Sequence, residues 1–160
     1  MLKGLQPLSS KEPRILILGS MPSLTSLEVS EYYAYKLNRF WTIMQCIYGG
    51  SISNYNDKKN IIYDNHLALW DSIGMCERIG SLDSSIKNVI PNPIEEYIRD
   101  NPTIQLVVCN GKKSHTVYNR YFGNLKIRVV CLPSTSNANT TSNFEVIKET
   151  WINNFKSENF

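Results

Sequence analysis

The fold of this chain is decided by one stretch, Arg14-Ile15-Leu16-Ile17-Leu18-Gly19-Ser20-Met21-Pro22-Ser23. It begins with an unbroken aliphatic run, which is typical of a strand buried on both faces of a parallel sheet. Gly19 ends the run and allows the backbone to pass close to a ligand. The loop that follows is either a binding loop or an ordinary strand-to-helix turn, and by itself it favours the turn. It has neither the Walker lysine nor the GxGxxG pattern of phosphate-cradling loops.

Three further apolar runs predict strands at residues 67–70, 104–109 and 127–132. Because ligands of parallel sheets bind beyond the carboxyl ends of the strands, the residues just after each run are candidates for a binding site. Small and polar segments stand there at 19–22, 110–111 and 133–139. Their recurrence at one edge of the sheet predicts a functional site.

The intervening segments carry helix signals. Apolar residues at helical spacing predict a helix from residue 40 that stops at Gly49-Gly50. Further helices are expected over residues 93–101, where acidic residues follow a proline, and from 112 to 122. Ser142 and Glu145 form a capping box that opens a final helix. Strands alternating with helices predict an α/β fold with a mostly parallel sheet of four strands.

The composition is that of one domain spanning residues 1–160, because this length suits a single core and 42% of the residues are hydrophobic. The net charge of +3 permits a nucleic-acid partner but is too small to mark the whole chain as a phosphate binder. Any DNA affinity must therefore come from local charge. No apolar run is long enough to span a membrane, and the first residues lack an apolar signal core, so we expect a soluble cytoplasmic domain.

The cysteines and histidines form no metal-binding pattern. No two cysteines are close in sequence, as zinc and iron–sulfur sites usually require. Cys109 and Cys131 lie at the ends of apolar runs, and we expect both as reduced thiols in the core. His66 and His115 have no second ligand at metal spacing. We expect no metal and no cofactor.

The segment Asn38-Arg39-Phe40-Trp41 combines an amide, a cation and two aromatic rings at the start of a helix. Asn38 could hold a water or a base edge, Phe40 could stack on a base, and Arg39 could reach a phosphate. The alternative is a capping Asn38 with both rings in the core. On these residues alone, the two interpretations are evenly matched.

Two later segments have a functional and a plain interpretation. Asn110 could offer a donor and an acceptor to a base edge, or it could belong to an ordinary Asn-Gly turn. The loop at residues 132–139 offers hydroxyl and N–H groups that suit phosphate oxygens, or it simply leads into the last helix. Asp71 and Asp83 could form a carboxylate pair for hydrolysis, although their spacing does not establish one.

Taken together, several stretches resemble the uracil-DNA glycosylase superfamily, and most closely its hypoxanthine-DNA glycosylase branch. They occur in family order over residues 15 to about 140 and are Ile17-Leu-Gly-Ser-Met-Pro-Ser23, Tyr32-Tyr33, Asn38-Arg-Phe-Trp41, Leu69-Trp-Asp71 with Cys76-Glu77, Gly80-Ser-Leu-Asp-Ser84, Asn110-Gly-Lys-Lys113, and Leu132-Pro-Ser-Thr-Ser136 with Ala138-Asn139. The resemblance implies a three-layer α/β/α domain that removes deaminated bases, chiefly hypoxanthine, from DNA.

The resemblance also implies roles for particular residues. Asn38 corresponds to the catalytic amide, which orients water, and Phe40 to the ring that stacks on the flipped base. Base contacts are expected from Asn110, Ser20 and Met21. DNA contacts are expected from Arg39, Lys112, Lys113, Pro133, Ser134, Thr135 and Ser136. Because no lysine stands at a catalytic position of these motifs, we expect a glycosylase without lyase activity. We also expect it to be a monomer.

Two stretches depart from the family pattern. Tyr35-Lys36-Leu37 stands where a His-Pro-Arg-like sequence usually precedes the catalytic Asn, and Asn137 stands where a proline usually follows the second motif. Neither change removes a proposed chemical group, but both alter loop stiffness. Three other functions stay open: a mismatch-specific uracil glycosylase, a non-catalytic nucleic-acid-binding module of the same fold, and a small-molecule hydrolase that uses Asp71 or Asp83.

Overall fold

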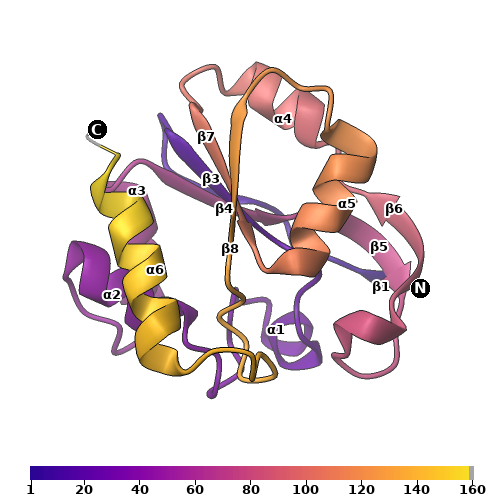
Figure 1. Cartoon of the computed structure of the whole chain (residues 1–160), viewed down its shortest axis with the longest axis horizontal. Coiled ribbons are helices and arrows are strands. Elements are labelled where there is room, and N and C mark those ends of the chain that lie inside the picture. Colours follow the sequence, from indigo (N-terminus) through magenta and orange to yellow (C-terminus); the bar gives the residue numbers. More distant parts are fainter. Residues whose placement is uncertain (159–160) are drawn as a thin grey trace.

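A five-stranded sheet forms the centre of the molecule in a computed structural model that describes residues 1–158 (Figure 1). Four parallel strands lie side by side, and a short strand pairs antiparallel at one edge. In spatial order they are β2 (Leu8–Ser9), β4 (Leu67–Asp71), β3 (Ile15–Gly19), β7 (Leu106–Asn110) and β8 (Arg128–Leu132). The mostly parallel sheet of four predicted strands is therefore confirmed, with β2 added to it.

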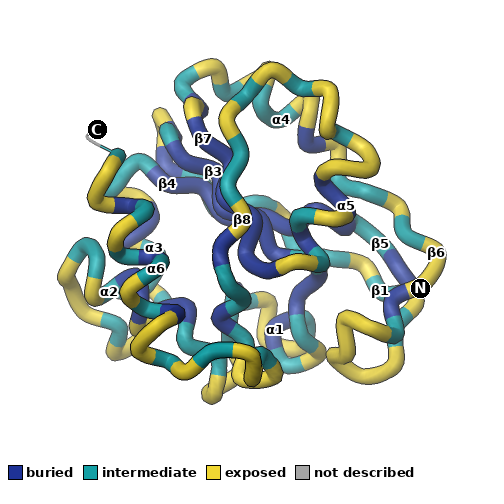
Figure 2. The backbone as a smooth tube through the Cα atoms, in the orientation of Figure 1, coloured by how far each residue is buried: buried dark blue, intermediate teal, exposed yellow. Residues whose placement is uncertain are grey.

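Helices cover both faces of this sheet, which gives the three-layer α/β/α arrangement that the family resemblance implied (Figure 1). One layer consists of α2 (Phe40–Tyr48), α3 (Tyr55–Asp64) and α6 (Phe144–Lys156). The opposite layer consists of α4 (Ile94–Asp100) and α5 (Lys112–Phe122). The buried strands lie between these layers, while the outer faces of the helices are exposed (Figure 2).

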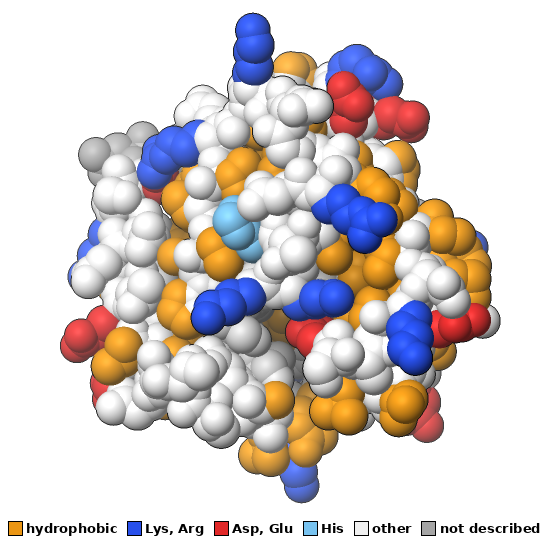
Figure 3. Space-filling model, turned by 45° about the vertical axis from the view of Figure 1, so that its right-hand side comes forward, with side chains coloured by type: hydrophobic (Ala, Val, Ile, Leu, Met, Phe, Trp, Pro, Cys, Tyr) orange, Lys and Arg blue, Asp and Glu red, His pale blue; other side chains and the backbone are white. Residues whose placement is uncertain are grey.

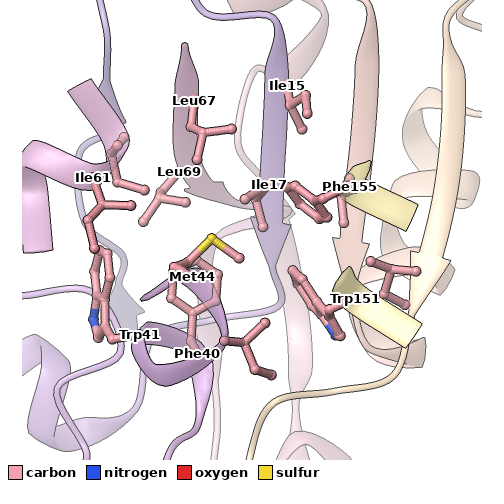
Figure 4. Close-up of a cluster of buried hydrophobic side chains, with 14 of the residues drawn as sticks. Ile15, Ile17, Phe40, Trp41, Met44, Ile61, Leu67, Leu69, Trp151 and Phe155 are labelled. Atoms are coloured by element: carbon pink, nitrogen blue, oxygen red, sulfur yellow. The ribbon is translucent and has the colours of Figure 1, made fainter. Parts of the chain in front are cut away.

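The alternation of side chains along β3 explains why this strand is aliphatic throughout. Ile15 and Ile17 point into a core shared with α2, α3 and α6 (Figure 4), whereas Leu16 and Leu18 point into the core beneath α4 and α5. A strand with helices on both faces has no side for polar residues. The central position of β3 places Gly19 and the loop after it in the middle of one sheet edge.

A second, smaller sheet was not predicted. It is antiparallel, in the order β1 (Leu2–Lys3), β5 (Ile73–Glu77) and β6 (Lys87–Pro91). The short helices α1 (Leu24–Val29) and η1 (Asp83–Ser85) lie in the loops on this side of the molecule. A small core of Met21, Ile73, Cys76, Ile86 and Val117 joins this sheet to α5.

The described structure corrects two local predictions. The final helix is capped by Asn143, whose Oδ1 accepts from the Val146 N–H at 3.0 Å, and not by Ser142, which lies one residue further out. Cys131 is exposed, because β8 is an edge strand with one side open, whereas Cys109 is buried as expected. Burial raises the pKa of the Cys109 thiol to about 12.

Candidate active site

The carboxyl ends of the parallel strands bring the predicted segments together. Gly19 pairs in register with Asp71, and Asn110 pairs with Leu132. The loops after these residues therefore meet at one edge, and the segment from Tyr33 to Phe40 is hydrogen-bonded to them. The sequence prediction that these separate segments form one cluster is confirmed.

Thr135 lies at the centre of the cluster and is fully buried. Its backbone N–H donates to Asn110 Oδ1 at 3.0 Å, and its hydroxyl accepts from Asn110 Nδ2 at 3.0 Å. The same hydroxyl donates to Asn38 Oδ1 at 2.9 Å. Thr135 is thus a connector between two amides, and a DNA contact from this residue stays a prediction.

The amide of Asn38 has a fixed orientation. Its Oδ1 accepts from the Phe40 backbone N–H at 2.9 Å and from the Thr135 hydroxyl at 2.9 Å. Since a backbone N–H can only donate, the oxygen must be the atom on this side. Within residues 1–158, Asn38 Nδ2 donates to no protein atom, and Asn38 is only half-buried. The side chain therefore presents an N–H donor.

Tyr33 occupies the face of Phe40 that was expected to receive a base. The two rings are stacked, with centroids 4.0 Å apart and planes at 18°. Phe40 is fully buried, and Trp41 and Trp151 pack edge-on against it. In this conformation Phe40 supports the half-buried Tyr33 from behind, and stacking of a base on Phe40 itself stays a prediction.

Asn110 is hydrogen-bonded within the cluster, and its contact with a base stays a prediction. One N–H of its amide donates to the Tyr33 hydroxyl at 3.2 Å, and the other donates to Thr135. Its carbonyl oxygen accepts from the Thr135 N–H. With every polar atom of the amide engaged, Asn110 positions Tyr33 and Thr135.

Arg39 clamps the loop at residues 133–136. Its guanidinium donates to Ser136 O at 2.7 Å and to Thr135 O at 3.3 Å, and it lies 5.6 Å from the ring centre of Phe144. Trp151 fixes the same loop by donating to Pro133 O at 2.8 Å. A phosphate contact through the remaining N–H groups of Arg39 stays a prediction.

In the loop that follows β3, the side chains of Ser20 and Met21 lie in different surroundings. The Ser20 hydroxyl donates to Asp83 Oδ1 at 2.8 Å, which ties the loop to η1. Met21 is only 7% exposed and packs against Ile73 and Cys76. Its side chain belongs to the small core, and base contacts from Ser20 and Met21 stay predictions.

Asp71 places a carboxyl group beside the same cluster. The Asp71 side chain is buried, and its Oδ2 has no hydrogen-bond partner. Burial, with the negative charge of Asp83 as a smaller cause, raises the pKa of Asp71 to about 7, against an opposing effect of Arg78. Burial likewise raises the pKa of Tyr33, so its phenol is neutral across the physiological range.

Two lysines and a tight turn lie at the same edge of the sheet, where β7 leads into α5. Lys112 and Lys113 lie in the first turn of α5, beside Gly111. Gly111 has φ of +95°, and a Cβ added to it would lie 3.0 Å from Ser134 Cβ. Only glycine allows the turn and the Pro133–Ser136 loop to approach this closely. The half-buried Pro133, Ser134 and Ser136 thus stand next to the start of α5.

Sequence reasoning missed Tyr33 as the ring above Phe40 and used Asp71 only in an alternative function. The signal for Asp71 was present, because it stands at the carboxyl end of a parallel strand as Asn110 does. Tyr33 gave a weaker signal: its left-handed backbone, with φ of 53°, is not readable from its residue type. Among residues 1–158, no group of three or more His, Cys, Asp or Glu is arranged to hold a metal ion. No helix in this part of the chain is long and apolar enough to cross a membrane.

Comparison with known proteins gives consistent matches. The family model described as "Uracil DNA glycosylase superfamily" matches residues 6–154. A hypoxanthine DNA glycosylase of Methanosarcina barkeri is 31% identical over 156 residues, which is 96% of this chain and 98% of that protein. Another from Methanosarcina acetivorans is 30% identical over 86% of this chain and 87% of its own length. A candidate uracil DNA glycosylase of Methanosarcina acetivorans, known from a solution NMR structure, superposes with a TM-score of 0.84 at 28% identity, covering 97% of this chain and 96% of that one.

Proposed function

This chain belongs to the uracil DNA glycosylase superfamily, and from that premise we propose that it hydrolyses the N-glycosidic bond of hypoxanthine in DNA. The products are an abasic site and the free base. Both Methanosarcina relatives carry the name hypoxanthine DNA glycosylase. The observation that carries the proposal is the fixed amide of Asn38, which two hydrogen bonds hold at the strand ends with its N–H group unused by the protein.

The reaction begins with extrusion of the damaged nucleotide from the duplex. Flipping costs a few kcal/mol, and least at a mispaired base such as hypoxanthine opposite thymine. Stacking of the flipped base on the outer face of Tyr33 returns about 1–3 kcal/mol. Phe40 stabilises Tyr33 from behind, and Asn110 holds its hydroxyl. Tyr33 therefore takes the role that the sequence assigned to Phe40.

Bond cleavage proceeds through an oxocarbenium-like sugar. Asn38 cannot act as a strong base, but its Nδ2–H can hold a water oxygen close to the anomeric carbon, so its role is positioning. Thr135 keeps the amide from rotating. The attacking group in this proposal is water, so the enzyme forms no Schiff base and leaves the sugar–phosphate backbone intact.

DNA is gripped next to the site. Lys112 and Lys113 stand at the N-terminus of α5, where the helix dipole also favours a phosphate. Ser134 and Ser136 offer nearby polar groups, and Pro133 keeps their loop stiff. Lys and Arg side chains stand singly on the face that carries α5 and do not form one continuous patch (Figure 3). Isolated cations suit an enzyme that touches few phosphates, and we propose that it acts as a cytoplasmic monomer.

Uracil is the second candidate substrate, because the structural relative from Methanosarcina acetivorans is described as a candidate uracil DNA glycosylase. Hypoxanthine and uracil both carry a ring N–H beside a carbonyl. A non-catalytic binding module is the less favoured alternative, since binding alone does not need the fixed amide of Asn38. A small-molecule hydrolase using Asp71 or Asp83 would be indifferent to DNA.

The experiment is a direct excision assay. Duplexes with one deoxyinosine, deoxyuridine or deoxyxanthosine are incubated with excess protein, and abasic sites are then cleaved with alkali. We expect strand cleavage at deoxyinosine and a slower reaction at deoxyuridine. Intact deoxyinosine strands would refute the proposed activity, and faster cleavage at deoxyuridine would favour the second candidate.

A further inference from the structure

Asp71 carries a carboxyl group that the mechanism above does not use. Asp71 is the last residue of β4, where it pairs in register with Gly19. Only 4% of its surface is exposed. A Cβ added to Gly19 would lie 2.4 Å from Asp71 Oδ1 and 3.2 Å from the Tyr33 hydroxyl. The carboxyl of Asp71 and the phenol of Tyr33 therefore border the same point above Gly19, at the edge of the ring proposed to stack on the base.

One oxygen of this carboxyl makes no hydrogen bond in the folded protein. Asp71 Oδ2 is buried and has no hydrogen-bond partner, a situation that typically costs about 1–3 kcal/mol. Buried polar atoms without a partner are uncommon in native proteins, and a catalytic role is one of the explanations for such an atom. Unlike the other atoms of this kind in residues 1–158, Asp71 Oδ2 belongs to a side chain at the proposed site. Here the ligand with matching chemistry is the base that leaves the sugar.

The surroundings favour the neutral form of the carboxyl. Burial and the charge of Asp83 raise its pKa to about 7, and Arg78 acts in the opposite direction. The other titratable groups facing it are Tyr32 and Tyr33, whose own pKa values are raised by burial, so both are uncharged near neutral pH. A substantial fraction of Asp71 can therefore hold a proton where an ordinary carboxyl would not.

We propose that Asp71 is a catalytic acid that transfers its carboxyl proton to N7 of the leaving hypoxanthine, an inference that rests on the proposed function. As the C1′–N9 bond breaks, its electron pair passes to the base, which departs as the neutral N7–H tautomer. Water adds to C1′ and releases one proton to solvent, and the Asp71 carboxylate takes up one proton from solvent. No group is oxidised or reduced.

This assignment also gives a reason for a purine preference. Uracil has no N7 and must leave without help at that position. Asp71 therefore acts as a specificity determinant as well as an acid, because it accelerates only a base that presents a basic nitrogen away from the glycosidic bond.

The test measures single-turnover excision by the wild type, Asp71→Asn and the control Asp100→Asn, which changes an exposed carboxyl at the end of α4. On a deoxyinosine duplex below pH 7, we expect Asp71→Asn to be about 100-fold or more slower than the wild type, as for loss of a general acid. Asp100→Asn keeps the wild-type rate. The wild-type rate falls as the pH rises from 6 to 9, and the rate of Asp71→Asn does not. On a deoxyuridine duplex the loss is smaller.

Three results would overturn the inference. The first is an Asp71→Asn rate on deoxyinosine equal to that of the wild type, which contradicts this inference alone. The second is a wild-type rate that does not fall between pH 6 and 9, which decides the matter even if circular dichroism shows that the variant is unfolded. The third is a wild type that leaves deoxyinosine intact at every pH, which removes the proposed function and this inference with it.

Discussion

Thr135 organises the site from a fully buried position. Its buried hydroxyl accepts from Asn110 and donates to Asn38, so one oxygen sets the orientation of two amides. An amide that could rotate would present either its oxygen or its nitrogen to the reacting water. The fixed orientation of Asn38 therefore depends on a neighbour that sequence analysis assigned to DNA binding.

Replacing Thr135 by valine tests this dependence. The change keeps the shape of the side chain but leaves an N–H of Asn110 without its acceptor, which costs about 1–3 kcal/mol of unfolding free energy. We expect a lower urea midpoint and slower excision from deoxyinosine duplexes. Thr116→Val, at an exposed position on α5, serves as the control. Unchanged stability and rate in Thr135→Val would contradict the connector role.

Tyr33 offers a second test at the scale of one residue. Tyr33→Ala removes the stacking surface and is expected to weaken binding of a deoxyinosine duplex by about 1–3 kcal/mol, the usual contribution of one stacked base. Tyr33→Phe keeps the ring and should bind nearly as the wild type does. Fluorescence titration with a non-cleavable analogue measures both. Equal affinity of the Ala variant and the wild type would return the stacking role to another ring.

Among the helices and strands, the sequence predicted best the strands whose own residues are mostly apolar. The runs that became β3, β4, β7 and β8 need no partner to be recognised, since each is aliphatic over about one strand length. The small sheet was missed because β1 spans only Leu2–Lys3, β5 contains Gly74, and β6 ends at Pro91. Such strands exist through pairing with each other, which local sequence does not encode.

The site was predictable as a meeting of loops but not in its detailed contacts. Carboxyl ends of parallel strands share an edge whatever the side chains are, so the grouping followed from the order of the elements. The roles of Phe40, Asn110 and Thr135 depend on which ring lies in front and which amide is already bonded. Those contacts join residues up to 97 positions apart, as for Thr135 and Asn38, and appear only in the folded chain.

The turn between β7 and α5 gives a prediction about elements. Gly111→Ala places a methyl group 3.0 Å from Ser134 Cβ at a residue with φ of +95°. Backbone strain of this kind costs about 1–3 kcal/mol, and the contact should also displace the Pro133–Ser136 loop. We expect lower stability and slower excision. Gly49→Ala separates the two effects, because its φ is +75° but nothing lies within 4 Å.

Gly49→Ala should therefore lose stability and keep its excision rate per folded molecule. Thermal unfolding and single-turnover assays on the same samples measure both quantities. If both variants lost stability and neither lost activity, the close approach of the turn to the loop would have no part in catalysis.

For the whole molecule, the buried Asp71 predicts how stability changes with pH. Its pKa is raised from 3.8 to about 7 by burial, so between these values the folded state holds a proton that the unfolded state has released. Unfolding then becomes easier as the pH rises, by up to about 1.4 kcal/mol per pH unit from this group. Urea unfolding from pH 4.5 to 7.5 should show stability falling, and Asp71→Asn should show a smaller fall than Asp100→Asn. Identical slopes in the two variants would contradict the burial of an unpaired carboxyl.

Excision of hypoxanthine by this protein requires the fixed amide of Asn38, and one comparison of variants tests that requirement most directly. Single-turnover excision from a duplex with one deoxyinosine is measured for the wild type, Asn38→Ala and Asn60→Ala, the last at an exposed position on α3. Loss of a positioning group predicts a rate at least about 100-fold lower for Asn38→Ala, with Asn60→Ala equal to the wild type. Excision by Asn38→Ala at the wild-type rate would contradict the account.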